Sequence, residues 1–304
     1  MAFAALGVGG GGGPQKNKTP TRVATRAALL LLAPGLAYLA LFFLTPFFSL
    51  VMLSLRPNAI SGAKGFDAGN YIYALTEFLP QILTSFSYAL LATVFALALS
   101  YPIAYYIGVK LRDRLFLRGL LLTLVIAPFF ISFLLRTFAW KQILSNDSPV
   151  VQFLQSIGIL GSGEYLLGTP FSVVFGLTTT FIPFMTLPIF ATLDRLDLRL
   201  LEAGSDLYAS PAATFWKVTF PLSLPGVTSG TLLTFIPISG DYVIASRDFL
   251  GGSETSMIGN VVEAQFLRIL GNEPIAASMS IVLMTVVLVL VGLYVRRSGT
   301  EDLL

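Results

Sequence analysis

Residues that could carry catalytic chemistry are scarce in this chain, which has neither histidine nor cysteine among its 304 residues. Without histidine, zinc sites of the His-Glu-x-x-His type and triads built on a histidine base are excluded. Without cysteine, disulfides and thiolate ligands are excluded as well. No Gly-x-x-x-x-Gly-Lys-Ser/Thr sequence occurs, so we do not expect the chain to bind ATP through a phosphate-binding loop.

The acidic residues do not form a catalytic pair either. An intramembrane aspartyl protease needs two carboxylates on facing helices, and Asp241 is the only acid near the interior of an apolar segment. We therefore expect a chain that is not an enzyme, binds no metal and needs no cofactor of its own.

A charged stretch at residues 194–221 predicts a different kind of chemistry, namely the binding of a partner. Asp197 can cap a helix that runs from Leu198 to about Tyr208. Ser210 is a favourable N-cap, and Pro211 is a favourable first residue for a second short helix. The stretch therefore predicts a helix-turn-helix.

The charges of this stretch favour a protein partner over the membrane surface, although a hairpin lying on the bilayer remains the alternative. A helix that lies on the negative cytoplasmic leaflet should carry more lysine and arginine than acid. This stretch carries four acids. They are Asp194, Asp197, Glu202 and Asp206.

The surrounding elements are those of a polytopic membrane protein. Apolar residues make up 55% of the chain and charged residues only 12%, where a soluble domain carries about 25%. Its mean hydropathy is +0.80. Charge-poor segments near the length of about 20 residues that crosses a bilayer predict six spans. These lie at residues 27–55, 81–109, 118–140, 168–193, 222–246 and 274–295 of a domain covering 27–297. We expect residues 1–26 to form a disordered arm and 298–304 a short tail.

Lysine and arginine set the expected direction of insertion, because they are enriched on the cytoplasmic side. With the N-terminus in the cytoplasm, 13 of these residues fall inside and 6 outside, which accounts for the 19 in the chain. Both termini and the loop 194–221 are then cytoplasmic. The net charge of +3 follows from this distribution and gives no reason to expect nucleic acid as a partner.

The loop resembles the signature of permease subunits of binding-protein-dependent ABC importers. That signature reads Glu-Ala-Ala, three residues, Gly, nine residues, then Ile-x-Leu-Pro. Here the spacing is kept by Glu202-Ala203-Gly204, Tyr208, Val218, Phe220 and Pro221. Gly204 replaces the second alanine and Tyr208 the glycine that lets the loop turn tightly, so Ser210 and Pro211 are expected to supply the break.

The resemblance implies an all-α type I importer permease with six transmembrane helices, in which the cytoplasmic helix-turn-helix couples to the ATPase. The coupling residues it implies are Glu202, Ala203, Gly204, Asp206, Leu207, Tyr208, Ser210 and Pro211. It also implies a dimer of ABC ATPase subunits that use ATP and Mg, a second, similar but different permease, and an extracytoplasmic solute-binding protein. The location implied is the bacterial inner membrane.

Shorter stretches look like the spermidine/putrescine branch of the family. They are Arg136-Thr137-Phe138-Ala139-Trp140, Gly240-Asp241-Tyr242-Val243, Leu250-Gly251-Gly252, Met257-Ile258-Gly259-Asn260 and Gln265-Phe266. The branch implies polyamine as the solute. Ferric iron, opine and amino-acid-like cations remain alternatives within the same class. A stand-alone secondary transporter or channel is a rival, but it needs a coupling-ion site and inverted repeats, and we find neither.

A polyamine passage should offer carboxylates for charge and aromatic faces for cation–π contact. The candidates are Asp241, Tyr242, Phe184, Thr180 and Glu263. An acid at membrane depth usually faces a cavity. The plainer alternatives are that Asp241 marks the solvated end of its span, that Thr180 and Phe184 only pack helices, and that Glu263 lies on a solvated face.

Overall fold

The computed structural model describes residues 22–58, 65–161, 163–267 and 271–298. Every regular element in those ranges is helical, and no strand occurs among them, in agreement with the all-α prediction. The chain divides into two units, Met1–Leu50 and Val51–Leu304, which are described separately. Residues 1–21 of the predicted arm and 299–304 of the predicted tail lie outside the described residues.

The first unit is built on one long apolar helix. Helix α1 (Arg22–Leu39) takes in the last residues of the predicted arm and passes through a π-helical turn, Ala40–Leu44, into α2 (Thr45–Ser54). Residues Leu31–Ser54 meet the length and hydropathy expected of a membrane span. A helix of that length reaches about 36 Å, which is enough to cross the hydrocarbon layer.

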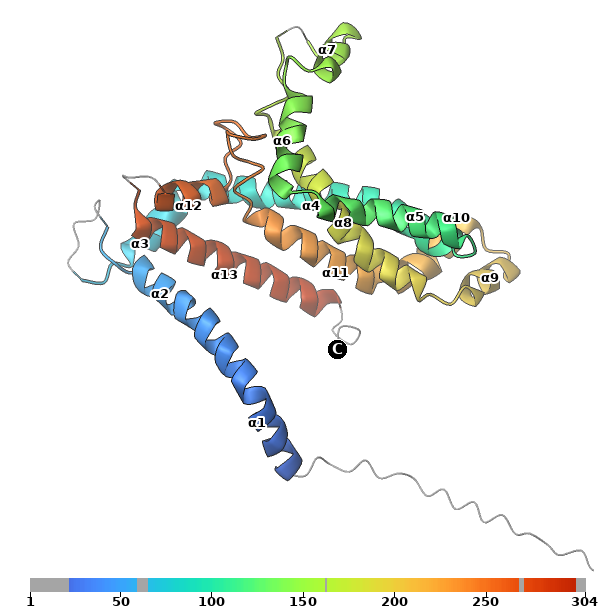
Figure 1. The fold of residues 1–304 in the computed structure, drawn as a ribbon, viewed down its shortest axis with the longest axis horizontal. Coiled ribbons are helices and arrows are strands. Elements are labelled where there is room, and N and C mark those ends of the chain that lie inside the picture. Colours follow the sequence, from blue (N-terminus) through green and yellow to red (C-terminus); the bar gives the residue numbers. More distant parts are fainter. Residues whose placement is uncertain (1–21, 59–64, 162, 268–270, 299–304) are drawn as a thin grey trace, which may run out of the picture. The chain divides into compact units, whose positions relative to one another are not determined.

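Four long helices form the core of the second unit (Figure 1). They are α4 (Leu79–Tyr105), α8 (Pro170–Asp194), α11 (Phe220–Ser239) and α13 (Glu273–Ser298). Helices α4, α8 and α11 pack against one another, and α13 packs against α11. Helix α11 ends before residue 246, where the sequence placed the end of the fifth span, so Asp241 lies beyond the helix.

Small residues allow these helices to approach closely. Ala89, Ala92 and Ala96 of α4 are fully buried. A Cβ atom at Gly230 of α11 would lie 2.9 Å from the Sδ atom of Met185 and 3.0 Å from its carbonyl oxygen. Helices in membranes associate through such close packing, because lipid supplies no hydrophobic drive between them.

The third predicted span is broken, where the sequence suggested one continuous helix over 118–140. Helix α5 (Leu115–Ile126) runs into a 3-10 turn, Ala127–Phe130, and α6 (Phe133–Leu144) leaves it after a bend of 96°. Ser132 has an extended ψ of 132°, and Nη1 of Arg136 donates to the carbonyl oxygen of Pro128 at 2.8 Å, which holds the bend. Helix α7 (Pro149–Ser156) follows, capped by Ser148.

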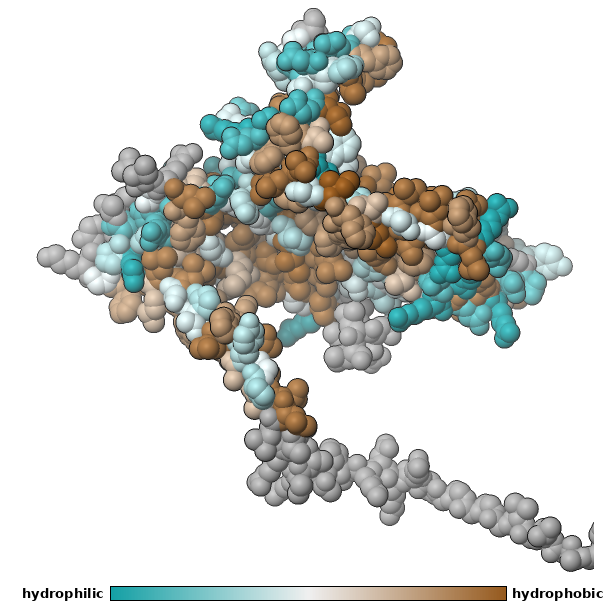
Figure 2. Space-filling model, viewed as in Figure 1, coloured by the Kyte–Doolittle hydropathy of each residue, from teal (hydrophilic) through white to brown (hydrophobic). Residues whose placement is uncertain are grey.

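The short helices lie at the two ends of this bundle (Figure 1). Helices α9 (Arg199–Asp206) and α10 (Pro211–Thr214) lie at one end, the α9 end, while α3 (Gly69–Glu77) and α12 (Ile258–Leu267) lie at the other. A π-helical turn, η4 (Phe215–Thr219), joins α10 to α11. Figure 2 shows hydrophobic residues over the long helices and hydrophilic residues gathered at the α9 end. In the described part, five helices can cross a membrane, or six if the bent pair is one span.

Candidate functional site

The first candidate site is the helix-turn-helix at the α9 end. Oδ1 of Asp197 accepts the backbone N–H of Arg199 at 3.0 Å, which places a cap at the start of α9. Oγ of Ser210 accepts the N–H of Ala213 at 3.2 Å, and Pro211 is the first residue of α10. Both caps were predicted from the sequence, because they depend only on residues a few positions apart.

Tyr208 makes the turn that ends α9, while Ser210 and Pro211, to which the sequence assigned the break, begin α10. Its φ of 56° lies in the left-handed region, and among the described residues it is the only non-glycine residue with a positive φ. The N–H of Ala209 then donates to the carbonyl oxygen of Gly204 at 3.0 Å, the closing bond of a helix C-terminus. The position therefore keeps the conformation that favours glycine, although the residue is tyrosine.

Gly204 has a packing role that the sequence did not reveal. A Cβ atom there would lie 3.0 Å from Oγ1 and 3.1 Å from Cγ2 of Thr214 in α10. The absence of a side chain thus lets α9 and α10 approach. Gly204 therefore packs against α10, whereas Leu207, three residues further along the chain, is exposed.

The outer surface of the helix-turn-helix combines acids with apolar side chains. Glu202, Ala203 and Asp206 are exposed. Leu207 is 81% exposed, Tyr208 99% and Trp216 63%. Trp216 was not among the predicted coupling residues, although an aromatic residue soon after a helix-starting proline could have marked it. A surface of this kind suits a protein partner, because aromatic anchors dominate binding energy at interfaces.

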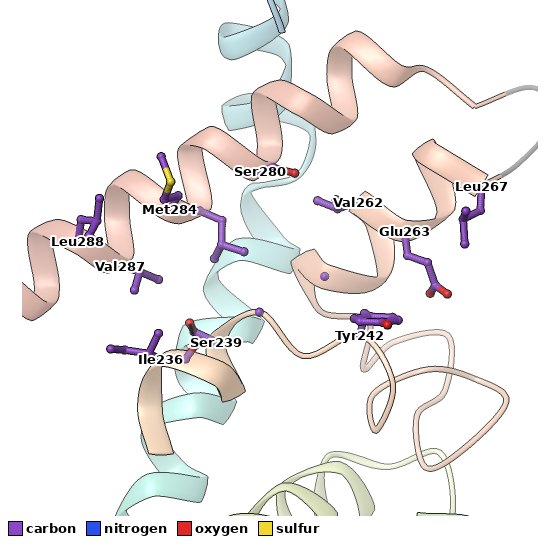
Figure 3. A pocket seen from close by; sticks show the side chains of 13 residues that line it. Ile236, Ser239, Tyr242, Val262, Glu263, Leu267, Ser280, Met284, Val287 and Leu288 are labelled. Carbon is purple, nitrogen blue, oxygen red and sulfur yellow. Dashed lines mark hydrogen bonds between the residues drawn. The ribbon is translucent and has the colours of Figure 1, made fainter. Parts of the chain in front are cut away.

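The second candidate site is a cavity of about 610 Å³ between α11, α12 and α13, which we call the α11–α13 cavity. Apolar side chains line most of it (Figure 3). The residues that line it include Ile236, Val262, Leu283, Met284, Val287 and Leu288. In Figure 3 Glu263 and Tyr242 lie close together at one end, while Met284, Val287 and Leu288 lie toward the other. The cavity thus has an apolar body and one end with a carboxylate and an aromatic ring.

Backbone contacts position Tyr242 and α12. Nδ2 of Asn260 donates to the carbonyl oxygen of Tyr242 at 2.5 Å. A Cβ atom at Gly259 would lie 2.5 Å from the carbonyl oxygen of Asp241, so only glycine permits this close passage of the two segments. The start of α12 and the turn after α11 are held together in this way.

Glu263 also lines a second, polar cavity of about 620 Å³ on the connection between α11 and α12. Its other polar lining residues include Ser246, Arg247, Asp248, Asn260 and Gln265. Glu263 therefore borders both a polar cavity and an apolar one.

The remaining predicted passage residues lie elsewhere. Asp241 is half-buried in the turn after α11, and its Oδ1 accepts the N–H of Ala245 at 3.2 Å. Burial raises the pKa of this carboxyl to about 6. Thr180 is buried in α8, and Phe184 packs edge to face on Phe129 with ring centroids 4.9 Å apart. The structure thus brings together Tyr242 and Glu263, whereas Asp241, Thr180 and Phe184 do not line the α11–α13 cavity.

The chain is 36% identical over 234 residues to "Spermidine/putrescine transport system permease protein PotB" of Salmonella typhimurium (strain SL1344), covering 77% of this chain and 79% of that one. It is 33% identical over 269 residues to the protein of that name in Haemophilus influenzae, covering 88% of both.

Its fold matches a solved bacterial ABC transporter involved in import of the acidic polysaccharide alginate. The TM-score is 0.70 at 18% sequence identity, over 91% of this chain and 97% of that one, so the likeness concerns the fold. The chain thus has the type I importer permease fold. Residues 96–298 match the family described as "Binding-protein-dependent transport system inner membrane component". The chain therefore belongs to this family of multi-pass inner membrane transport components, and it is not an enzyme.

Proposed function

We propose that this chain is the permease subunit of an ATP-driven importer for polyamines, the class of spermidine and putrescine. The observation that carries the proposal is its 36% identity, over most of both chains, to a permease named for spermidine/putrescine transport. The other small polar solutes of the sequence analysis have no comparable support from the relatives.

The α11–α13 cavity suits a polyamine chemically. A polyamine consists of ammonium groups joined by methylene chains, so it needs both charge partners and apolar walls. Glu263 supplies a carboxylate and Tyr242 an aromatic face for cation–π contact, while Met284 and Leu288 offer surface to methylenes. The passage would extend beyond this cavity, and its further lining residues would be Asp241, Thr180 and Phe184.

The helix-turn-helix is the proposed docking surface for the ATPase subunit that drives transport. Its exposed acids and aromatic residues would dock on an ABC ATPase subunit, with Glu202 facing a basic residue of that partner. The passage would form between this chain and a second, similar permease, and a solute-binding protein would deliver polyamine from outside. Both termini and the α9 end would face the cytoplasm, and ATP and Mg would be bound by the ATPase subunits.

Uptake of labelled spermidine and putrescine tests the substrate assignment, in cells that carry the intact chain, a deletion, or Glu263→Gln. We expect the deletion to abolish uptake. Glu263→Gln should raise the KM about tenfold, since loss of one ion pair of about 1.4 kcal/mol corresponds to that factor. Glu273→Gln, in the first turn of α13 and exposed, is the matched control and should leave KM unchanged. Unaltered polyamine uptake in the deletion strain would remove the polyamine assignment and direct attention to ferric iron, opines and amino-acid-like cations.

A further inference from the structure

The α9 end holds a group of contacts that the proposed function does not use. Gly108 and Arg112 come from the end of α4 and the connection to α5, and Arg118 from the first turns of α5. Asp194 and Leu196 come from the place where α8 leads into the helix-turn-helix. We call these five residues the clasp.

Arg112 caps the C-terminus of α8. Its Nη1 donates to the carbonyl oxygen of Leu196 at 2.9 Å, and its Nη2 donates to the carbonyl oxygens of Leu193 at 3.1 Å and Asp194 at 2.5 Å. The last carbonyls of a helix have no partner within it and carry partial negative charge. A guanidinium fork can satisfy several of them at once, which a lysine ammonium at the same place does less well.

Three further contacts surround this cap. Arg118 forms an ion pair with Asp194, and its guanidinium carbon lies 5.5 Å from the ring centroid of Phe190. The side chains of the pair are only 22% and 34% exposed. A Cβ atom at Gly108 would lie 3.3 Å from the Cβ atom of Leu193, so α8 and the end of α4 are in direct contact.

The clasp lies a very short distance along the chain from the helix-turn-helix. Leu196 is buried, and α9 begins at Arg199. Three residues span at most about 10 Å even when fully extended, so little slack separates α9 from the carbonyl that Arg112 binds. The N–H of Arg199 donates to Oδ1 of Asp197 at 3.0 Å, which also ties the start of α9 to this short connection.

We propose that the clasp makes the ends of α4, α5 and α8 one body, and that Arg112 is a positioning residue which passes movement of α9 to α4 and α5. The inference rests on the proposed function, because it supposes that an ATPase moves α9. Without Arg112, the contacts of Arg118 with Asp194 and of Gly108 with Leu193 would still join α8 to α5 and α4, but the direct link to the carbonyl oxygen of Leu196, the one nearest α9, would be lost.

The first test compares Arg112→Ala with Arg114→Ala, which alters an exposed arginine on the same connection. Spermidine uptake and ATP hydrolysis are measured on the same transporter, assembled with its partner subunits in proteoliposomes. We expect Arg112→Ala to keep ATP hydrolysis while spermidine molecules carried per ATP fall at least tenfold. Arg112→Lys should recover part of this ratio, and Arg114→Ala should not change it.

The ratio separates a transmitting role from a structural one. A residue needed only for folding would lower uptake and hydrolysis together, in proportion to the folded protein, and that result would overturn the inference. An unchanged ratio in Arg112→Ala would overturn it too. If the wild-type chain itself shows no ATP-dependent uptake, the proposed function fails instead, so the two failures are distinguishable.

A second test uses the absence of cysteine from the chain. Cβ atoms at positions 108 and 193 would lie 3.3 Å apart, near the roughly 3.5–4.5 Å of a disulfide. The double variant Gly108→Cys, Leu193→Cys can therefore lock α4 to α8, with bond formation verified by mass spectrometry. If the clasp moves as one body, oxidised and reduced transporters carry spermidine equally fast. Loss of uptake on oxidation, regained on reduction, would show that the two helices separate there and would contradict the inference.

Discussion

Replacing Tyr208 with glycine should stabilise the turn between α9 and α10. The left-handed conformation, here at a φ of 56°, costs an L-residue roughly 1–2 kcal/mol. Glycine adopts this conformation without strain. Because glycine has more conformational freedom in the unfolded chain, ordering it costs about 0.5–1 kcal/mol more. Because the Tyr208 side chain is 99% exposed, its removal sacrifices almost no packing within the chain. The net gain should be about 0.5–1 kcal/mol.

Hydrogen exchange at the amide of Ala209 measures this gain directly, since that N–H bonds to the carbonyl oxygen of Gly204 at 3.0 Å. Exchange should slow roughly two- to fivefold in Tyr208→Gly, as each 1.4 kcal/mol corresponds to tenfold. Tyr208→Ala is the matched control, because it removes the same side chain but keeps the left-handed cost. Equal slowing in both variants, or faster exchange in the glycine variant, would refute the argument from backbone strain.

The same two variants address why tyrosine stands at this position. A costly backbone conformation persists when the residue contributes elsewhere, and Tyr208 has almost no surface covered by its own chain. If the ring contacts the ATPase subunit, both variants should bind that subunit more weakly by a similar factor, despite their different turn stabilities.

Two further predictions concern the packing of the bundle and its pH response. Gly230→Ala should lower stability by about 1–3 kcal/mol through overpacking against Met185, whereas Gly292→Ala on α13, with open space around it, should be nearly neutral by thermal unfolding in detergent. Asp241, with a pKa raised from 3.8 to about 6, disfavours the folded state when it is charged. Stability should therefore rise as pH falls from 7 through 6, by a total of about 3 kcal/mol once the pH is below 4, and Asp241→Asn should lose that rise. A variant with the same pH profile as the wild type would contradict this assignment.

Local chemistry made parts of this structure predictable from sequence. The caps at Asp197 and Ser210 depend on neighbours two and three residues away, and the long spans depend on uninterrupted apolar composition. The left-handed Tyr208 was not predicted, although it stands where the signature has glycine, because tyrosine rarely takes that conformation. The bend after Phe130 was also missed, since apolar composition continues through it and the bond from Arg136 to the Pro128 carbonyl appears only in three dimensions.

Residue type alone also could not show which of the candidate passage residues lie together in the fold. Residue type selected Tyr242 and Glu263 because an acid and an aromatic residue are what a cation needs, but only the structure shows that the two line one cavity. It equally selected Thr180, which is buried among helices, and Asp241, whose carboxyl turns to a backbone amide. Which polar side chain faces a cavity depends on the rotation of each helix in the bundle, and sequence spacing alone does not fix that rotation.

The most direct test of the central claim is ATP-driven uptake of spermidine into proteoliposomes that contain this chain with its partner subunits. Uptake should require ATP on the side of the α9 end, and Glu202→Ala should reduce it at least tenfold while the folded protein remains intact, because Glu202 is exposed. Asp113→Ala, an exposed acid at the same end, should transport normally. Spermidine uptake that proceeds equally well without ATP, or that is unaffected by Glu202→Ala, would contradict an importer driven through the helix-turn-helix.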